Sequence, residues 1–215
     1  MTSLFADRRD AGRDLAARLA DYADRPGVIV LALPRGGVPV AYEVASAIRA
    51  PLDVFVVRKL GVPGHRELAM GAIASGNVIV LNHDVVQHLG IEADTIDRVV
   101  TRERTELERR ELAYRGARAP LDVKGRCVIV VDDGIATGSS MLAAVEAVHA
   151  RAPERTVVAV PVASRSARDE LRSRVDEVVC ARALEPFFAV GQLYRDFTQT
   201  SDAEVEELLD AARGD

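Results

Sequence analysis

The sequence predicts an α/β domain in which a parallel sheet is flanked by helices. Apolar, β-branched runs of strand length alternate along the chain with stretches whose apolar residues recur at helical spacing. The runs have no polar face, which is typical of strands that are buried on both sides. Because 215 residues suffice for one well-filled core, we expect a single domain over residues 1–215.

The individual elements follow from the same pattern. Runs rich in Val, Ile and Leu predict strands at 28–33, 52–57, 127–131, 156–162 and 175–180. Helical spacing predicts helices at 3–23 with Ser3 as N-cap, and at 38–48, 92–115, 141–148, 167–174 and 201–212. Residues 61–90 break this rhythm with repeated Gly and Pro, which favours a small β-hairpin or hood with a mobile loop.

Composition restricts the class of protein. The formal net charge of -5 disfavours non-specific nucleic-acid binding, which needs a basic face. No apolar run approaches the roughly 18 residues of a membrane span, and the first residues carry no apolar signal core. Cys127 and Cys180 lie in apolar runs and suggest buried thiols in a reducing compartment. We therefore expect a cytoplasmic protein with no nucleic-acid or membrane partner.

The clearest functional signal is the stretch CVIVVDDGIATGSSM at 127–141. A buried strand ends in two adjacent carboxylates, Asp132 and Asp133, and a loop of small and hydroxylated residues then opens a helix. The carboxylates would repel a phosphate, so they suit hydroxyl groups or a divalent cation nearby. An ordinary capped loop remains an alternative, as does a two-carboxylate metal site of the phosphatase kind, although there the acids are usually separated by one residue.

The loop after the acids is suited to a phosphate. Gly134 and Gly138 let the backbone turn and approach a ligand, while Thr137 and Ser139 offer hydroxyls beside the free N–H groups of the helix N-terminus. Such a place binds phosphate. A ligand with a phosphate at one end and a diol at the other is a ribose 5-phosphate.

Residues 130–140 resemble the signature of the type I phosphoribosyltransferases, which use 5-phosphoribosyl 1-pyrophosphate (PRPP). The resemblance implies a Rossmann-like parallel sheet with a small hood subdomain, here at about 61–90 and 183–200. It also implies that Asp132 and Asp133 face the ribose hydroxyls. The expected contacts to ribose and 5-phosphate come from Asp132, Asp133, Gly134, Ile135, Ala136, Thr137, Gly138 and Ser139.

A second strand-to-helix junction, LPRGG at 33–37, forms a smaller anion site. Gly36 and Gly37 free the backbone at the helix start, and Arg35 can grip a pair of phosphoryl oxygens. The junction is similar to the loop that holds pyrophosphate in the family. A helix-capping turn without a ligand would show the same residues, but ligands of parallel sheets gather at this edge.

A basic pair, Arg58 and Lys59, ends the predicted strand 52–57 at the same edge. It resembles a pair that the family often carries there, and the resemblance implies that it contacts pyrophosphate. The alternative is that both charged groups reach into water. The predicted pyrophosphate-binding residues are Arg35, Gly36, Gly37, Arg58 and Lys59.

The resemblance implies transfer of the 5-phosphoribosyl group to a nitrogenous base, with release of pyrophosphate, in nucleotide salvage. Cleavage builds positive charge on the ribose and negative charge on the leaving group. Mg²⁺, held indirectly through PRPP near Asp132 and Asp133, would stabilise the leaving group together with Lys59, while the acids favour the sugar cation. The predicted catalytic residues are Asp132, Asp133 and Lys59.

The acceptor is a nucleobase-like compound whose identity the sequence leaves open. Phe187 and Phe188 either stack on it, as in the 6-oxopurine branch of the family, or pack in the core. Ala136 stands where that branch has a general base, so hypoxanthine and guanine are disfavoured. His65 and Glu67 could assist proton transfer or be solvated.

Two further points stay open at this stage. The densely charged helix 92–115 could form a homodimer contact. A non-catalytic PRPP- or nucleotide-binding regulatory protein would use the same loops, and release of pyrophosphate with a panel of bases would separate the two functions. A nicotinamide dehydrogenase is disfavoured, because no Gly-x-Gly-x-x-Gly turn follows the first strand.

Overall fold

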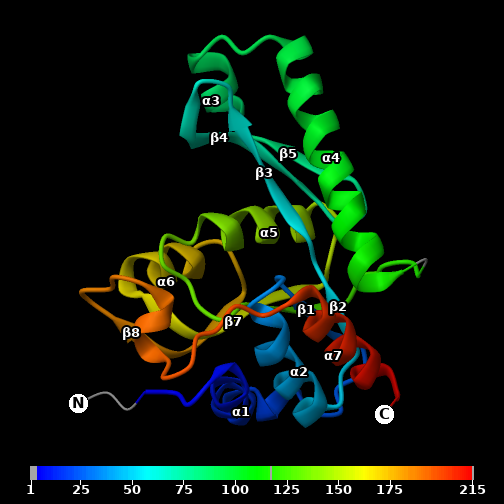
Figure 1. Cartoon of the computed structure of the whole chain (residues 1–215), viewed down its shortest axis with the longest axis vertical. Helices are drawn as coiled ribbons and strands as arrows, with labels where there is room; N and C mark the ends of the chain where they lie inside the picture. The colour runs from blue at the N-terminus through cyan, green and yellow to red at the C-terminus, as the bar shows by residue number, and fades with distance from the viewer. Residues whose placement is uncertain (1–3, 117, 215) are drawn as a thin grey trace.

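A computed structural model describes residues 4–116 and 118–214, with Arg66 and Glu67 described in their backbone alone. Five strands form a parallel sheet in the order β2-β1-β6-β7-β8 (Figure 1). They are β1 (Val28–Ala32), β2 (Leu52–Val54), β6 (Cys127–Val131), β7 (Arg155–Ser164) and β8 (Glu177–Leu184). The predicted parallel α/β fold is confirmed.

Helices cover both faces of this sheet. One face packs against α1 (Arg8–Arg18), α2 (Gly37–Ile48) and α7 (Asp202–Gly214), and the other against α5 (Ser139–His149) and α6 (Arg165–Arg172). Alternate residues of β1 serve the two layers, since Val28 and Val30 face α1 and α2 while Ile29 and Leu31 face α5. Short 3₁₀ turns lie at Ala20–Tyr22 (η1) and Val190–Leu193 (η2).

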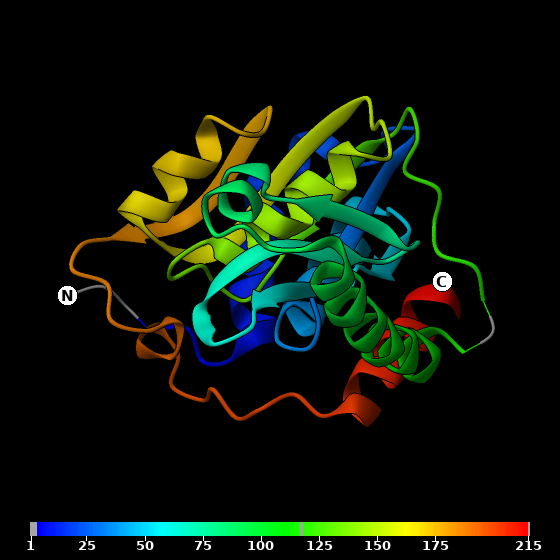
Figure 2. The ribbon, with the colours of Figure 1, turned by 90° about the horizontal axis from the view of Figure 1, so that it is seen from above.

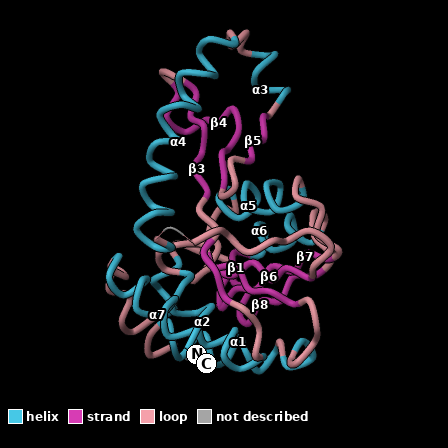
Figure 3. The backbone as a smooth tube through the Cα atoms, turned by 90° about the vertical axis from the view of Figure 1, so that its right-hand side faces the viewer, coloured by secondary structure: helices cyan, strands magenta, loops and turns pink. Residues whose placement is uncertain are grey.

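A second, antiparallel sheet stands on the α5 side of the molecule (Figures 2 and 3). Its strands are β3 (Val57–Val62), β4 (His65–Ala74) and β5 (Val78–Leu81), followed by α3 (His83–His88) and α4 (Ala93–Arg115). Leu60, Met70 and Ile73 of the sheet pack with Val99 and Val100 of α4 in a core of their own. Residues 57–100 therefore form the hood, which includes the predicted hairpin region.

The predicted strand 52–57 is divided between the two sheets. β2 ends at Val54 and β3 begins at Val57, so the chain leaves the parallel sheet at Phe55 and Val56. Both of these side chains are fully buried. The apolar run continues because the crossing is as buried as the strands, and hydrophobicity alone does not reveal the change of sheet.

The N-terminal helix is shorter than predicted. It begins at Arg8, because the Asp7 carboxylate accepts the Asp10 N–H at 2.7 Å and caps it. Ser3, the expected cap, lies outside the described residues. The helix ends at Arg18, and η1 follows.

Residues 193–196 run alongside the N-terminal segment. Phe5 donates its N–H to Leu193 O at 2.9 Å, and Arg195 donates to Phe5 O at 2.9 Å. Phe5, Leu193 and Tyr194 share a small core with α1 and β7. The two segments that we expected to form one hood, 61–90 and 183–200, thus lie in different parts of the molecule, because the latter is tied to the chain start (Figure 1).

Candidate functional site

The acid pair and the loop after it lie at the carboxyl end of β6. Ile135 anchors this loop, because its N–H donates to Val162 O at 2.9 Å and its carbonyl accepts the Ser164 N–H at 2.9 Å. The Ile135 side chain is buried and its N–H is already donated to Val162 O, so neither is free for the phosphate contact that the sequence predicts. Ala136, Thr137 and Ser139 are exposed, and the loop is therefore open to a ligand.

Glycine is required at two positions of the loop for different reasons. Gly138 has φ +79°, a left-handed conformation that side chains rarely adopt, and it precedes the first turn of α5. A Cβ on Gly134 would lie 2.5 Å from methyl groups of Val162 and Val190. Gly134 is therefore required by packing, rather than by the approach of a ligand that the sequence suggested.

The second predicted loop touches the acid pair directly. A Cβ on Gly36 would overlap the Asp133 carboxylate, and one on Gly37 would lie 2.9 Å from Asp132 Cα. The two loops are thus brought together as predicted. However, the Gly37 N–H already donates to Leu33 O at 3.1 Å, so this amide is engaged within the turn.

Arg35 points from this loop towards the C-terminal helix. Its Nη1 lies 3.6 Å from Asp202 Oδ1 at the start of α7. Asp202 Oδ1 also accepts the Tyr114 hydroxyl of α4 at 2.8 Å. The predicted pyrophosphate arginine is therefore held in a contact between three elements, and binding an anion would require it to turn.

The structure separates the two members of the basic pair. Lys59 Nζ donates to Ser139 Oγ at 2.6 Å, which places it beside the predicted phosphate loop, residues 134–139. Arg58 Nη2 lies 2.6 Å from Glu103 Oε2 on α4. Successive residues of a strand point to opposite sides, so only one of the pair can serve the loop. Lys59 is well placed for an anion, and Arg58 links the hood sheet to α4.

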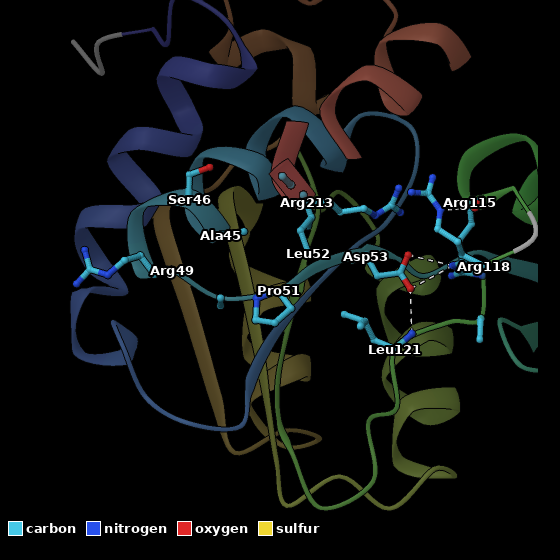
Figure 4. A pocket seen from close by; sticks show the side chains of 13 residues that line it. Ala45, Ser46, Arg49, Pro51, Leu52, Asp53, Arg115, Arg118, Leu121 and Arg213 are labelled. Carbon is cyan, nitrogen blue, oxygen red and sulfur yellow. Dashed lines mark hydrogen bonds and ion pairs between the residues drawn. The ribbon is translucent and has the colours of Figure 1, made fainter. Parts of the chain in front are cut away.

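A cleft with a volume of about 1010 Å³ lies between the hood sheet and α5. Lys59 and Ser139 line this cleft, so it adjoins the predicted phosphate loop. A second cavity of about 630 Å³ lies at the start of β2, with Asp53 and Arg115 on its wall (Figure 4). None of the predicted site residues lines this second cavity.

Two residues that sequence reasoning missed contact Asp133. Arg8 Nε donates to Asp133 Oδ2 at 2.8 Å across 125 residues of sequence. The Tyr194 hydroxyl donates to the Asp133 carbonyl at 2.6 Å. Burial raises the pKa of Tyr194, which keeps this donor protonated. The aromatic cluster around 187–197 was a signal for Tyr194, whereas nothing local to Arg8 distinguishes it from other surface arginines.

The electrostatics of the acid pair oppose ionisation. Burial raises the pKa of Asp132, and the neighbouring Asp133 raises it further. Burial also raises the pKa of Asp133, while its hydrogen bond from Arg8 lowers it. The folded protein therefore holds two buried carboxylates side by side although their ionisation costs free energy, which is typical of functional sites.

The remaining candidate residues divide clearly. Phe187 packs against the core around Phe5, whereas Phe188 is 83% exposed and available to a ligand. His65 is exposed at the turn between β3 and β4, and the side chain of Glu67 lies outside the described part. Both cysteines are free thiols but half-buried rather than buried, as β8 lies at the sheet edge and Cys127 at a strand start.

No cluster of three His, Cys, Asp or Glu side chains that could hold a metal ion occurs among the described residues. In the same part of the chain, no helix combines the length and apolarity that crossing a bilayer requires.

Comparison with known proteins agrees with this geometry. The chain is 50% identical over 212 residues to two Mycobacterium tuberculosis proteins, named "Putative phosphoribosyl transferase MT0597" and "Putative phosphoribosyl transferase Rv0571c". These matches cover 99% of this chain and 48% of theirs, so the chain spans about half the length of the curated relatives it matches.

Solved structures give the same result for the fold. The crystal structure of TT1426 from Thermus thermophilus is 44% identical, with a TM-score of 0.87 over 96% of this chain and 97% of that one. A hypothetical protein from Neisseria gonorrhoeae with bound ppGpp shares the fold at 12% identity and a TM-score of 0.50, over 99% of both chains. The family model "Phosphoribosyl transferase domain" matches residues 3–197. The chain therefore belongs to the phosphoribosyl transferase domain family.

Proposed function

We propose that this chain transfers the 5-phosphoribosyl group of PRPP to a nitrogenous base, with Mg²⁺, and releases pyrophosphate. The observation that carries the proposal is the meeting of the open loop 134–139, the acid pair and the loop 33–37 at one edge of the sheet. Family membership supports the reaction class, and the acceptor is a nucleobase-like compound.

In this proposal the 5-phosphate binds in the loop before α5. The free N–H groups of the helix start and the hydroxyls of Thr137 and Ser139 surround it. Lys59, which donates to Ser139 Oγ at 2.6 Å, adds a positive charge to the same place. The site combines neutral donors with one cation, which suits a phosphate monoester.

The ribose is assigned to the two acids. Asp132 Oδ1 accepts the Asp133 N–H at 2.8 Å, and Asp133 Oδ2 accepts from Arg8 at 2.8 Å. Within the described residues, the other oxygen of each carboxylate has no hydrogen-bond donor. These two oxygens would accept the 2′- and 3′-hydroxyls, and their charge would favour the cation that develops on the sugar.

The leaving group is assigned to the loop 33–37. Arg35 would turn from Asp202 to the pyrophosphate, a shift that its 3.6 Å ion pair at a partly exposed site permits at low cost. Gly36 lets the loop lie directly against Asp133. Mg²⁺, held through PRPP near Asp132 and Asp133, would neutralise part of the diphosphate charge. Phe188 offers an exposed ring on which a flat acceptor can stack.

The test is release of pyrophosphate from PRPP and Mg²⁺ with a panel of nucleobases. Asp133→Asn should lower turnover by well over about tenfold, because it removes charge from the proposed ribose site. Asp14→Asn is the matched control, since Asp14 lies on the outer side of α1 in an exposed pair with Arg18. Full activity of Asp133→Asn would remove the acids from the mechanism.

Binding of PRPP without release of pyrophosphate for every base would instead favour the regulatory alternative. A role in cytoplasmic nucleotide salvage and a homodimer contact through α4 remain predictions that accompany the proposal. The oligomeric state is measured by sedimentation, in which a monomer would contradict the predicted contact.

A further inference from the structure

We infer that Arg8, in the first turn of α1, is a positioning residue that holds the Asp133 carboxylate for the sugar hydroxyls. The inference rests on the proposed function, because it takes Asp133 as a ribose contact. It makes α1 part of the site, although its sequence indicates a helix that only packs.

Arg8 is fixed by three partners. Its Nε donates to Asp133 Oδ2 at 2.8 Å, and its Nη1 donates to Thr198 O at 2.7 Å. The guanidinium carbon lies 4.0 Å from the centre of the Phe197 ring. The Arg8 and Asp133 side chains are only 11% and 14% exposed, so water screens their interaction weakly. A planar guanidinium can satisfy all three partners at once, whereas an ammonium group cannot.

The contact orients the carboxylate. A Cβ on Gly36 would overlap the same oxygen, Oδ2, that Arg8 binds. Oδ2 is thus enclosed between Arg8 and the 33–37 loop. Rotation of the carboxylate is blocked, and Oδ1 is left for a ligand. The same contact therefore selects which oxygen of Asp133 the sugar meets.

Arg8 also supplies positive charge beside the two acids. The groups that face Asp133 are Asp132 in its own loop, Arg8 from α1, the neutral Tyr194 hydroxyl after η2, and the 33–37 loop, whose Arg35 pairs with Asp202. Two adjacent acids repel each other, and burial raises the pKa of both. Arg8 opposes this effect at Asp133.

The same arginine joins the site to the chain start. Asp196 donates its N–H to Ala6 O at 3.0 Å, and Phe5 pairs with Tyr194. The segment 193–198 is therefore fastened on one side to residues 5–8 and on the other to Asp133. Arg8 lies at the junction, so its position transmits the placement of this segment to the acid.

The experiment compares two small ligands by calorimetry on the full chain. Ribose 5-phosphate engages the phosphate loop and the acids, whereas inorganic phosphate engages the loop alone. Arg8→Gln should weaken ribose 5-phosphate by about tenfold or more, as expected for loss of a charge-assisted hydrogen bond, and change inorganic phosphate by less than about twofold. Arg8→Lys should recover part of the loss. Arg9→Gln is the control, since Arg9 is half exposed and lies 3.5 Å from Glu43.

A double-mutant cycle completes the test. If Arg8 acts through Asp133, Arg8→Gln should add little to the loss caused by Asp133→Asn. Unchanged affinity of Arg8→Gln for ribose 5-phosphate overturns the inference. Equal losses for both ligands also overturn it, because they indicate a merely structural role. Failure of the proposed reaction is seen separately, as ribose 5-phosphate binding without pyrophosphate release.

Discussion

The ion pair of Asp53 and Arg115 fastens the end of α4 to β2, and its removal should destabilise the fold (Figure 4). The two side chains are 5% and 4% exposed. Arg115 Nε lies 3.0 Å and 3.1 Å from the two Asp53 oxygens, and Nη2 donates to Val54 O at 2.8 Å. Arg115→Met keeps much of the volume but leaves a buried carboxylate whose remaining donors are the N–H groups of Val54 and Leu121.

Removing one partner of a buried pair costs about 3–5 kcal/mol. For a chain of this size, each kcal/mol shifts Tm by about 2–4 °C, so Arg115→Met should lower it by about 6–20 °C. Urea denaturation followed by circular dichroism measures the free energy of unfolding. Arg118→Met is the control, because Arg118 is 51% exposed and its pair with Asp210 should contribute less than about 1 kcal/mol.

The second half of the experiment adds Asp53→Asn to Arg115→Met. This double variant removes both charges of the Asp53–Arg115 pair and leaves only Glu111, the 20% exposed second partner of Arg115, without its ion pair. It should therefore be more stable than Arg115→Met alone. A loss of less than about 1 kcal/mol for Arg115→Met would refute the reasoning. So would a double variant that is at least as unstable as the single one.

Three further predictions concern the site. Gly36→Ala places a methyl group against the Asp133 carboxylate and should weaken the binding of ribose 5-phosphate by about tenfold. Gly61→Ala is the control, because its methyl group meets open space and should leave binding unchanged. Equal affinities of the two variants in calorimetry would contradict this prediction. The pKa of Asp132 is raised on folding, so the stability that this group contributes is lost as pH rises through its folded-state pKa. Asp132→Asn should therefore be more stable than the parent near about pH 7 and should lose this advantage in acid. A stability difference in urea denaturation that does not change with pH would refute this prediction. Lys59→Met should raise KM for PRPP by about tenfold and Arg58→Met by less than about threefold, and kinetics with the reverse order would exclude the proposed role of Lys59.

The sequence is sufficient to predict the β6 junction because all of its determinants are local. The buried strand, the two acids and the hydroxylated loop occupy residues 127–141, and the structure places them as a strand, an open loop and a helix start. The alternation of strands and helices likewise predicts the parallel sheet, because a helix between two strands is the usual connection between parallel neighbours.

Tertiary packing decides what the sequence does not. Arg58 and Lys59 are neighbours with the same charge, yet one pairs with Glu103 on α4 and the other reaches Ser139. Their directions depend on which sheet the strand joins. The chain changes sheet at Phe55 and Val56, and because both side chains are apolar and buried, the sequence does not mark the change. The contact of Arg8 with Asp133 joins residues far apart in sequence, so no periodicity or motif marks it.

The position of β1 has a consequence for how such proteins can diverge. This strand pairs with β2 on one side and with β6 on the other, and the chain between those two neighbours includes the hood sheet, α3 and α4. Because this segment leaves the sheet after β2 and re-enters it at β6, on the two sides of β1, it forms a single insertion between neighbouring parts of the sheet. Its length and lining can therefore vary among such proteins, while the strand order that carries the loops 33–37 and 134–139 stays the same.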